Sequence, residues 1–217
     1  KLIIPVHFSG VASNMEQISD IAKKNNAYIV EDASHALGGY YPNGEPVGSC
    51  IYSEMTIFSL HPVKGVTAGE GGVITTNNRE IARALKQLRS HGICKGNFDL
   101  PGISVGDDTI INKSEALENG KLNPWYYEMQ TLGYNYRITD IQCALAISQL
   151  MKLEQFVDRK KEIVSKYGGK NLSKRLRISH PAVSKWKVIP PFRAIQIEKL
   201  GDFQAEYIRP DINFNLA

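Results

Sequence analysis

The sequence is poor in cysteine and has no long apolar run. Its three cysteines, Cys50, Cys94 and Cys143, lie far apart and form no Cys-x-x-Cys pair. A disulfide framework and a zinc site are therefore not indicated, no metal is expected, and we predict reduced cysteines and a cytoplasmic protein. No stretch approaches the roughly 18 apolar residues that a membrane-spanning helix needs, so no membrane partner is expected.

The beginning of the chain lacks the features of a leader. Residues 1–6 contain no initiator Met, no basic region and no small-residue cleavage site, and they are typical of a core strand. We therefore expect the chain to be a piece of a longer protein. Its 42% hydrophobic and 22% charged residues are near globular averages, which disfavours long disorder and coiled coil.

Basic charge gathers towards the C-terminal end. Of the net charge of +4, residues 170–217 contribute +5, with nine lysines and arginines against four acids, and the rest of the chain sums to −1. A nucleic-acid-binding protein would concentrate basic residues and aromatics on its folded body. No nucleic-acid partner is therefore expected, and we interpret the basic segment as solvated surface or as sequence without a partner to fold against.

The order of the apolar runs predicts an α/β fold. A strand, a helix and a strand within about 30 residues form a βαβ unit, whose right-handed crossover makes the two strands parallel. Pro5 weakens the first strand, because proline donates no hydrogen bond to a sheet. The predicted strands are residues 2–7, 27–31, 55–59 and 72–76, and helices are predicted after residues 13–14 and 77–78.

The second half of the chain is less regular. Residues 95–124 are predicted to be a functional excursion or a mobile loop, because they are long and lack periodicity. Thr139 and Gln142 then fit a capping box, followed by an apolar stripe that is predicted to run to about Tyr167. After Gly168 the pattern suggests only a strand over residues 185–191, and no further structure is predicted.

Polar side chains follow two of the predicted strands. Asp32 comes directly after one strand, at the carboxyl end where open α/β sheets bind ligands. Lys64 follows another strand in a glycine-rich turn, where an amine held away from water is a nucleophile. Alone, Asp32 is also typical of a helix cap and Lys64 of a surface loop. Together they indicate pyridoxal phosphate, which needs a lysine for covalent attachment and a carboxylate that keeps its ring nitrogen protonated.

Two further residues extend this interpretation. Ser59, on the strand that precedes Lys64, can donate its hydroxyl to the phosphate of the cofactor. His35, three positions after Asp32, can reach the phenolic oxygen of the ring. The ordered set predicts the cofactor more strongly than any one residue.

Four segments together resemble the DegT/DnrJ/EryC1/StrS family of sugar aminotransferases. They are residues 31–38, 58–64, 69–72 and 132–142, and the resemblance extends to about residue 167. It implies part of the large domain of the pyridoxal-phosphate-dependent aspartate aminotransferase fold (fold type I), a mostly parallel sheet flanked by helices, with the start of the small domain. Residues 1–150 would be the C-terminal part of the large domain. Residues 151–217 would be a linking helix and an incomplete small-domain segment.

The resemblance also implies residue roles. Lys64 would bind the cofactor covalently and move a proton between substrate and cofactor, and Asp32 would pair with the ring nitrogen. Family members that dehydrate their substrate have His at the place of Lys64, so the lysine favours transamination. Asn135 would reach the phosphate in the neighbouring subunit's site, which implies a homodimer. The implied cofactor-binding residues are Lys64, Asp32, His35, Ser59 and Asn135, and candidate substrate contacts are His7, His61, Tyr134 and Arg137.

Residues 124–130 resemble one subgroup of the family. That subgroup aminates C4 of a UDP-linked 4-keto-6-deoxy-N-acetylhexosamine in pseudaminic acid biosynthesis, with glutamate as the expected amino donor. A truncated, non-catalytic family remnant stays open as an alternative, because the family's phosphate-binding wall precedes the position of Lys1, and we expect the chain alone to bind the cofactor weakly. A phosphate-binding module around residues 69–72 is a third interpretation, although it lacks the Gly-Lys-Ser/Thr ending of a P-loop.

Overall fold

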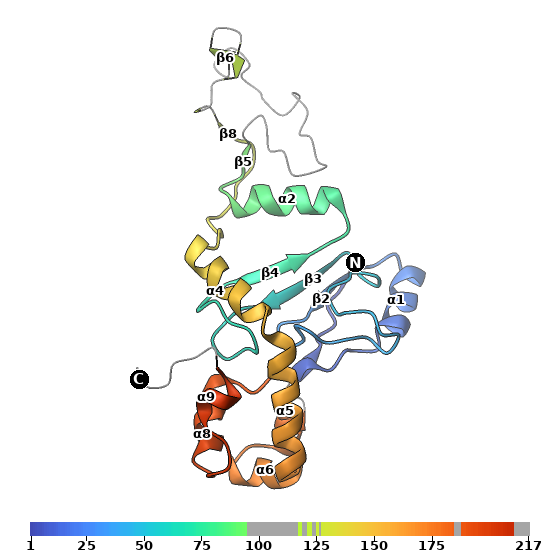
Figure 1. The fold of residues 1–217 in the computed structure, drawn as a ribbon. Coiled ribbons are helices and arrows are strands. Elements are labelled where there is room, and N and C mark those ends of the chain that lie inside the picture. The colour runs from blue at the N-terminus through green and yellow to red at the C-terminus, as the bar shows by residue number, and fades with distance from the viewer. Residues whose placement is uncertain (95–116, 119–120, 123–124, 126, 185–187, 211–217) are drawn as a thin grey trace. The chain divides into compact units, whose positions relative to one another are not determined.

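The computed structural model describes residues 1–94, 117–118, 121–122, 125, 127–184 and 188–210 (Figure 1). The chain divides into two compact units, one made of residues 1–77 and 139–217 and the other of residues 78–138. The irregular segment predicted over residues 95–124 lies largely outside the described residues. The domain boundary expected at residue 150 stays a prediction.

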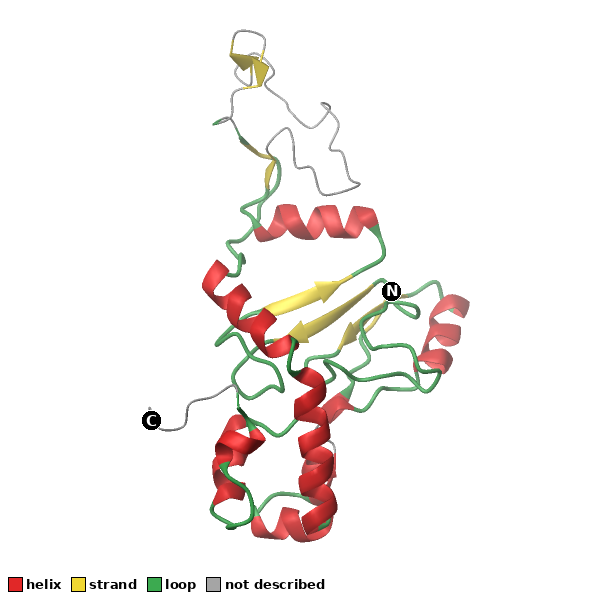
Figure 2. Cartoon of the chain, in the orientation of Figure 1, coloured by secondary structure: helices red, strands yellow, loops and turns green. Residues whose placement is uncertain are grey.

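A four-stranded sheet forms the centre of the first unit (Figure 2). The first three strands are parallel, and β4 is antiparallel to β3 because the chain returns through a loop without a helix. The predicted α/β architecture, a mostly parallel sheet flanked by helices, is thereby confirmed. The strands, in spatial order, are β1 (Leu2–Ile3), β2 (Tyr28–Asp32), β3 (Met55–Ser59) and β4 (Gly72–Thr75).

Proline shortens the first strand. β1 ends at Ile3 although a strand is predicted over residues 2–7, since Pro5 has no N–H to donate. Pairing resumes where Val6 lies opposite Asp32. The Asp32 N–H donates to the Pro5 carbonyl at 2.9 Å, and the His7 N–H donates to the Asp32 carbonyl at 2.9 Å. A 3-10 turn, η1 (Phe8–Gly10), follows and leads the chain away from the sheet.

Helix α1 (Met15–Lys24) connects β1 to β2, as the sequence predicts. The Asn14 side chain caps it by accepting a hydrogen bond from the Gln17 N–H at 3.4 Å. Its buried residues join the apolar core of the sheet, which consists of Met15, Ala22, Ile29, Ala33, Ala36, Tyr41, Val47 and Phe58.

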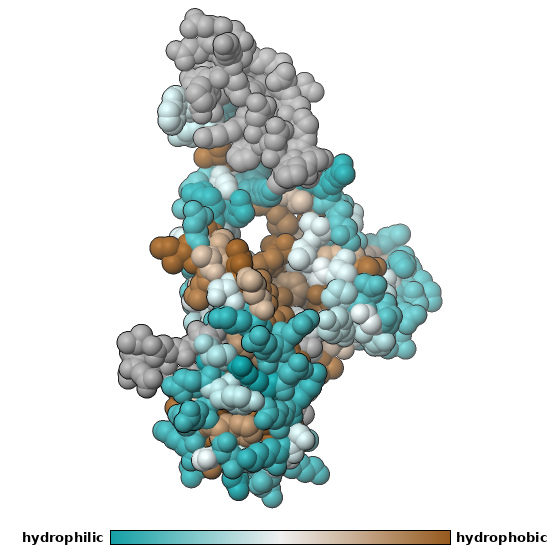
Figure 3. Space-filling view, in the orientation of Figure 1, coloured by the Kyte–Doolittle hydropathy of each residue, from teal (hydrophilic) through white to brown (hydrophobic). Residues whose placement is uncertain are grey.

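The stripe predicted after Thr139 forms two helices, α4 (Asp140–Leu150) and α5 (Leu153–Tyr167). The capping box is confirmed, because Thr139 Oγ1 accepts from the Gln142 N–H at 3.3 Å and Gln142 Oε1 accepts from the Thr139 N–H at 3.2 Å. Apolar side chains stay exposed along α4, where Figure 3 shows brown patches: Ile141, Leu145, Ile147, Leu150 and Met151.

The C-terminal segment is folded, although its sequence pattern predicts no such structure. Four short helices follow α5 and bury a second apolar core, which includes Ile163, Leu172, Ile189 and Ile197. Part of the strand suggested over residues 185–191 lies outside the described residues, namely residues 185–187. The described remainder forms no strand, and Pro191 begins a helix. The helices are α6 (Gly169–Arg175), α7 (His180–Ser184), α8 (Pro191–Glu198) and α9 (Ala205–Ile208).

The described residues of the second unit include helix α2 and short strands. Asn78 caps α2 (Arg79–Arg89), as the sequence predicts, by accepting from the Glu80 N–H at 2.8 Å. The strands are β5 (Ile93–Cys94), paired with β8 (Glu128–Met129), and β6 (Leu117–Glu118), paired with β7 (Lys121–Leu122). Across both units, no helix of the described ranges is long and apolar enough to cross a bilayer.

The C-terminal core makes a testable contribution to stability. Ile197 of α8 is 0% exposed, whereas Ile147 of α4 is 59% exposed. We expect Ile197→Ala to lower the free energy of unfolding by about 3 kcal/mol, because it leaves a cavity in a packed core. Ile147→Ala is the matched control and should change it by less than about 0.5 kcal/mol. Urea denaturation of the three chains measures both values, and equal effects would contradict the packing described for α8.

Candidate active site

A cavity of about 200 Å³ lies beside Lys64 in the first unit. Side chains of two kinds line it, polar groups that can bind a ligand and apolar groups that keep water out. The polar ones are Ser9, Ser34, His35, Ser59 and Lys64. The apolar ones are Leu37, Val63, Val66, Ala182, Val188 and Pro190.

The parallel pairing of β2 and β3 explains why residues distant in sequence meet here. Asp32 lies opposite Ile57, so both strands end at the same edge of the sheet. Ser34 and His35 continue from β2, and Ser59 is the last residue of β3. The structure thus brings His35, Ser59 and Lys64 to one cavity, whereas Asp32 is not among the residues that line it but lies near enough for the charge of Lys64 to act on its carboxylate.

Asp32 is held in its ionised form. Its Oδ1 accepts a hydrogen bond from the Ser34 N–H at 3.0 Å. The hydrogen bonds from Ser34 lower the pKa of Asp32 below its ordinary value, and the positive charge of Lys64 adds to this effect against the opposing effect of burial. Asp32 is therefore a carboxylate at neutral pH.

His35 is held in its neutral form. Burial lowers its pKa, and the charge of Lys64 lowers it further, while Asp32 opposes both. The Ser9 N–H donates to His35 Nδ1 at 3.2 Å, so Nδ1 is an acceptor and Nε2 carries the proton. The Phe8 ring makes an edge contact with the imidazole, with ring centroids 5.8 Å apart. His35 can therefore offer one N–H to a ligand.

The Lys64 amine is available for chemistry. The side chain is half-buried, and within the described part of the chain no hydrogen bond or ion pair engages its Nζ. The Ser59 hydroxyl is also available to a ligand. Its Oγ accepts from the His61 N–H at 3.3 Å, and among the described residues its own O–H has no acceptor. The His61 ring itself is half-exposed, with Nε2 3.7 Å from the Glu70 carboxylate.

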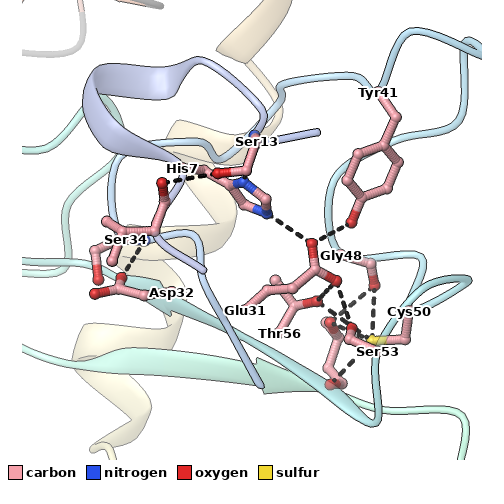
Figure 4. A network of polar contacts seen from close by, with 12 residues as sticks. His7, Ser13, Glu31, Asp32, Ser34, Tyr41, Gly48, Cys50, Ser53 and Thr56 are labelled. Atoms are coloured by element: carbon pink, nitrogen blue, oxygen red, sulfur yellow. Dashed lines mark hydrogen bonds and ion pairs between the residues drawn. The ribbon is translucent and has the colours of Figure 1, made fainter. Parts of the chain in front are cut away.

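Behind Asp32, a buried carboxylate joins several segments (Figure 4). Successive residues of a strand point to opposite faces, so Glu31 lies on the face away from Asp32 and is 0% exposed. Its Oε2 accepts from His7 Nε2 at 2.6 Å and from the Tyr41 hydroxyl at 2.7 Å. Its Oε1 accepts from Thr56 Oγ1 at 3.1 Å and from the Ser53 hydroxyl.

His7 contacts both this network and Asp32, because its ring donates to Glu31 and its backbone N–H donates to the Asp32 carbonyl. Its Nδ1 accepts from the Ser13 N–H at 3.0 Å, so the ring proton is on Nε2 and is donated to Glu31. Both ring nitrogens are occupied and the residue is 0% exposed. His7 therefore fits a structural role better than the substrate contact that the sequence suggests, because a buried ring with two satisfied nitrogens has no group left for a ligand.

The network keeps Glu31 ionised inside the fold. Burial alone would raise the pKa of Glu31, but the hydrogen bonds from His7, Ser53 and Tyr41 outweigh it and hold the pKa below its ordinary value. Burial and the same carboxylate raise the pKa of Tyr41, which therefore stays a hydroxyl donor. Four donors thus replace the water that a carboxylate would otherwise bind.

The remaining predicted residues lie in the second unit. Asn135 pairs with Ser90, and Tyr134 stacks on Tyr136 with ring centroids 4.9 Å apart. The side chains of Tyr134, Asn135 and Arg137 are exposed. Gly133 is needed for this arrangement, since a Cβ on it would lie 2.2 Å from the Gly92 backbone nitrogen. Their placement relative to Lys64 stays a prediction.

Sequence reasoning missed part of the cavity wall. Ser34 and Ser9 carry no motif of their own, although Ser34 lies within the segment that contains Asp32. Val188 comes from the C-terminal segment, where no period is visible. A Cβ on Gly65 would lie 3.2 Å from the Val188 side chain, so the glycine after Lys64 lets this wall approach closely.

The chain is similar to characterised enzymes over most of its length. A model of the DegT/DnrJ/EryC1/StrS aminotransferase family matches residues 1–188. A UDP-4-amino-4,6-dideoxy-N-acetyl-beta-L-altrosamine transaminase of Campylobacter jejuni is 40% identical over 162 residues, which are 75% of this chain and 35% of that protein. An uncharacterized protein of Methanocaldococcus jannaschii, MJ1066, is 39% identical over 77% of this chain and 38% of its own length. The chain thus spans little more than a third of these relatives.

Solved structures show the same similarity. Helicobacter pylori PseC, an aminotransferase involved in the biosynthesis of pseudoaminic acid, matches with a TM-score of 0.61 and 28% identity over 79% of this chain and 38% of PseC. The PLP-form of the putative sugar aminotransferase Spr1654 from Streptococcus pneumoniae matches with a TM-score of 0.59 and 26% identity over 78% of this chain and 41% of Spr1654. These neighbours are pyridoxal-phosphate aminotransferases of fold type I, which confirms the predicted fold class.

The Glu31 network predicts a pH dependence of stability. Because the pKa of Glu31 in the folded chain is below its ordinary value of 4.5, the carboxylate stabilises the fold above pH 4.5, and this contribution is lost as the pH falls through the folded-state pKa. We expect Glu31→Gln to lower the free energy of unfolding at pH 7 by about 3 kcal/mol, since the donors lose their charged acceptor.

Urea denaturation at several pH values measures this effect. The difference between the natural chain and Glu31→Gln should narrow below pH 4.5. The matched control is Glu45→Gln, because Glu45 is exposed and should contribute little at any pH. A difference that stays constant down to the acid limit would show that ionisation of Glu31 is unimportant for stability.

Proposed function

The chain belongs to the DegT/DnrJ/EryC1/StrS aminotransferase family, and we propose that it carries the lysine side of a sugar aminotransferase active site. Pyridoxal phosphate is the cofactor of this family, whose solved members include a PLP-form and a PMP-form. The observation that carries the proposal is the meeting of Lys64, His35 and Ser59 at one cavity, with the ionised Asp32 near enough for the charge of Lys64 to act on it.

The residues around the cavity fit this cofactor. When bound, pyridoxal phosphate supplies an electron sink for bonds made and broken at the carbon next to the amino nitrogen. Lys64 would hold it through Nζ, which has no competing partner among the described residues. The Asp32 carboxylate would hold the proton of the ring nitrogen, and the free O–H of Ser59 would donate to the phosphate.

The same side chains provide the proton movements of transamination. With the cofactor bound, the Lys64 amine would be the base that moves a proton between the reacting carbon of the substrate and the cofactor. Neutral His35 donates its Nε2–H without adding positive charge beside Lys64. Leu37 and the buried Val66 form an apolar part of the cavity wall.

The proposed substrate is a nucleotide sugar. Similarity to the C. jejuni altrosamine transaminase and to PseC supports amination at C4 of a UDP-linked 4-keto-6-deoxy-N-acetylhexosamine, the chemistry of pseudaminic acid biosynthesis, with glutamate as the donor. We infer that the reaction takes place in the cytoplasm. Free Cys50 and Cys143 are consistent with a reducing compartment.

We also propose that the working site needs more than this chain. The cavity of about 200 Å³ is smaller than the roughly 300–1,000 Å³ typical of small-molecule sites. The rest would come from other parts of the protein and, in a homodimer, from Asn135 of a second copy, with Tyr134, Arg137 and His61 as substrate contacts. Exposed apolar residues on α4 support an interface in the complete assembly, because such side chains tend to be covered.

Covalent trapping tests the central assignment. Incubation with pyridoxal phosphate and borohydride, followed by peptide mapping, is expected to label Lys64 about tenfold more than the average lysine, which corresponds to about 1.4 kcal/mol of binding preference at the cavity. Lys64→Arg should lose this label, and the control Lys24→Arg should keep it, because Lys24 is exposed at the end of α1. Preferential labelling of another lysine would remove the assignment, and equal labelling of all lysines would favour the non-catalytic remnant.

A further inference from the structure

Lys64 lies on a loop, residues 60–71, that closes at its base. The Leu60 N–H donates to the Gly71 carbonyl at 2.9 Å, and the Leu60 carbonyl accepts from the Ala68 N–H at 2.9 Å. The same carbonyl accepts from Thr67 Oγ1 at 2.9 Å. These bonds join the two ends of the loop, but they do not fix the loop against the rest of the fold.

Glycine shapes the end of this loop. Gly69 and Gly71 have positive φ angles of 80° and 136°, which glycine adopts at no steric cost. Such residues lose much conformational freedom when a loop is ordered. Leu60, Val66 and Ala68 of the loop are buried, and hydrogen bonds from outside the loop add to this packing in ordering the segment that carries Lys64.

Helix α4 supplies two such anchors. Gln149, which is 3% exposed, accepts a hydrogen bond at Oε1 from the Thr67 N–H at 2.8 Å. Gln142 donates from Nε2 to the Glu70 carbonyl at 3.0 Å. The two glutamines are two turns apart on one helix, and they meet the loop at two points that follow Lys64 in sequence.

Gln142 performs two tasks with the two ends of its amide. Its Oε1 accepts from the Thr139 N–H in the capping box, which turns Nε2 outward to Glu70. The capping contact stabilises α4, and the outward contact holds the loop. The chain thus uses the residue that caps the helix to attach the helix to the segment that carries Lys64.

We propose that Gln142 and Gln149 are positioning residues for Lys64, and that α4 acts as a brace that orders the loop over residues 60–71. The consequence for amine chemistry rests on the proposed function, whereas the brace itself does not. Loss of either anchor should free the loop and spread the Lys64 amine over more positions, so fewer of them would meet a ligand in the cavity.

Gln142→Glu separates the two tasks of Gln142. Glutamate is a standard partner in a capping box, so α4 keeps its cap, but the carboxylate cannot donate to the Glu70 carbonyl. We expect the melting temperature to fall by no more than about 4 °C, together with hydrogen exchange at the Thr67 and Ala68 amides that is about fivefold faster, the size of one lost hydrogen bond. Gln149→Met, of similar volume, should accelerate exchange at Thr67 at least as much.

Lysine trapping provides the second measurement, on the same 217-residue chain. The share of pyridoxal phosphate label at Lys64 should fall by about fivefold in Gln142→Glu and in Gln149→Met. Ser173→Ala is the control, because it removes a hydrogen bond of a buried side chain, from Ser173 Oγ to the Lys170 carbonyl, outside the loop. It should change neither exchange at Thr67 nor the Lys64 label.

The two measurements distinguish failure of the brace, failure of the positioning role and failure of the proposed function. Unchanged amide exchange in both Gln142→Glu and Gln149→Met would overturn the brace, whatever the labelling shows. Faster exchange with an unchanged Lys64 share would overturn the positioning role. If the natural chain does not label Lys64 selectively, the proposed function fails, and the exchange measurement still decides whether α4 orders the loop.

Discussion

The buried carboxylate of Glu31 is the constraint on which the rest of the site depends. An ionised group without water is stable inside a protein only when donors replace its hydration. His7, Tyr41, Ser53 and Thr56 provide these donors, and they come from three different segments. Satisfying one charge therefore fixes the connection after β1, the segment between β2 and β3, and β3 itself around the end of β2.

The alternating side chains of β2 mean that the position of Glu31 also determines the direction of Asp32. Because Glu31 is locked on one face of β2, Asp32 must point to the other face, and its backbone is held by Pro5 and His7. On that face Ser34 keeps the Asp32 carboxylate ionised beside Lys64 and His35. Lys64 lies on a loop to which two glutamines of α4 are hydrogen-bonded. The site thus combines a rigid acid with an amine on a braced loop.

Local features could be predicted wherever the physical cause is local. Asn14, Asn78 and the Thr139–Gln142 pair cap helices through contacts within three residues, so their motifs are visible in the sequence. The C-terminal helices are short and bury scattered residues of several elements, so no single period describes them. Gln149 bonds to Thr67, 82 positions away, and nothing local indicates this partner. The place of His7 after a strand left both a packed histidine and a substrate contact open, and its burial becomes apparent only when Glu31 is seen beside it.

The sequence by itself determined the α/β class, the helix caps and the family, and it predicted the pair formed by Asp32 and Lys64, which stays a proposal. These depend on hydrophobic periods, capping motifs and residues at strand ends, all of which are properties of neighbouring positions. Only the tertiary structure decided that His7 and Glu31 are structural, that the C-terminal segment forms part of the cavity wall, and that α4 holds the lysine loop. Each of these depends on which distant groups share a buried space, because burial sets the cost of an unsatisfied charge or hydrogen bond.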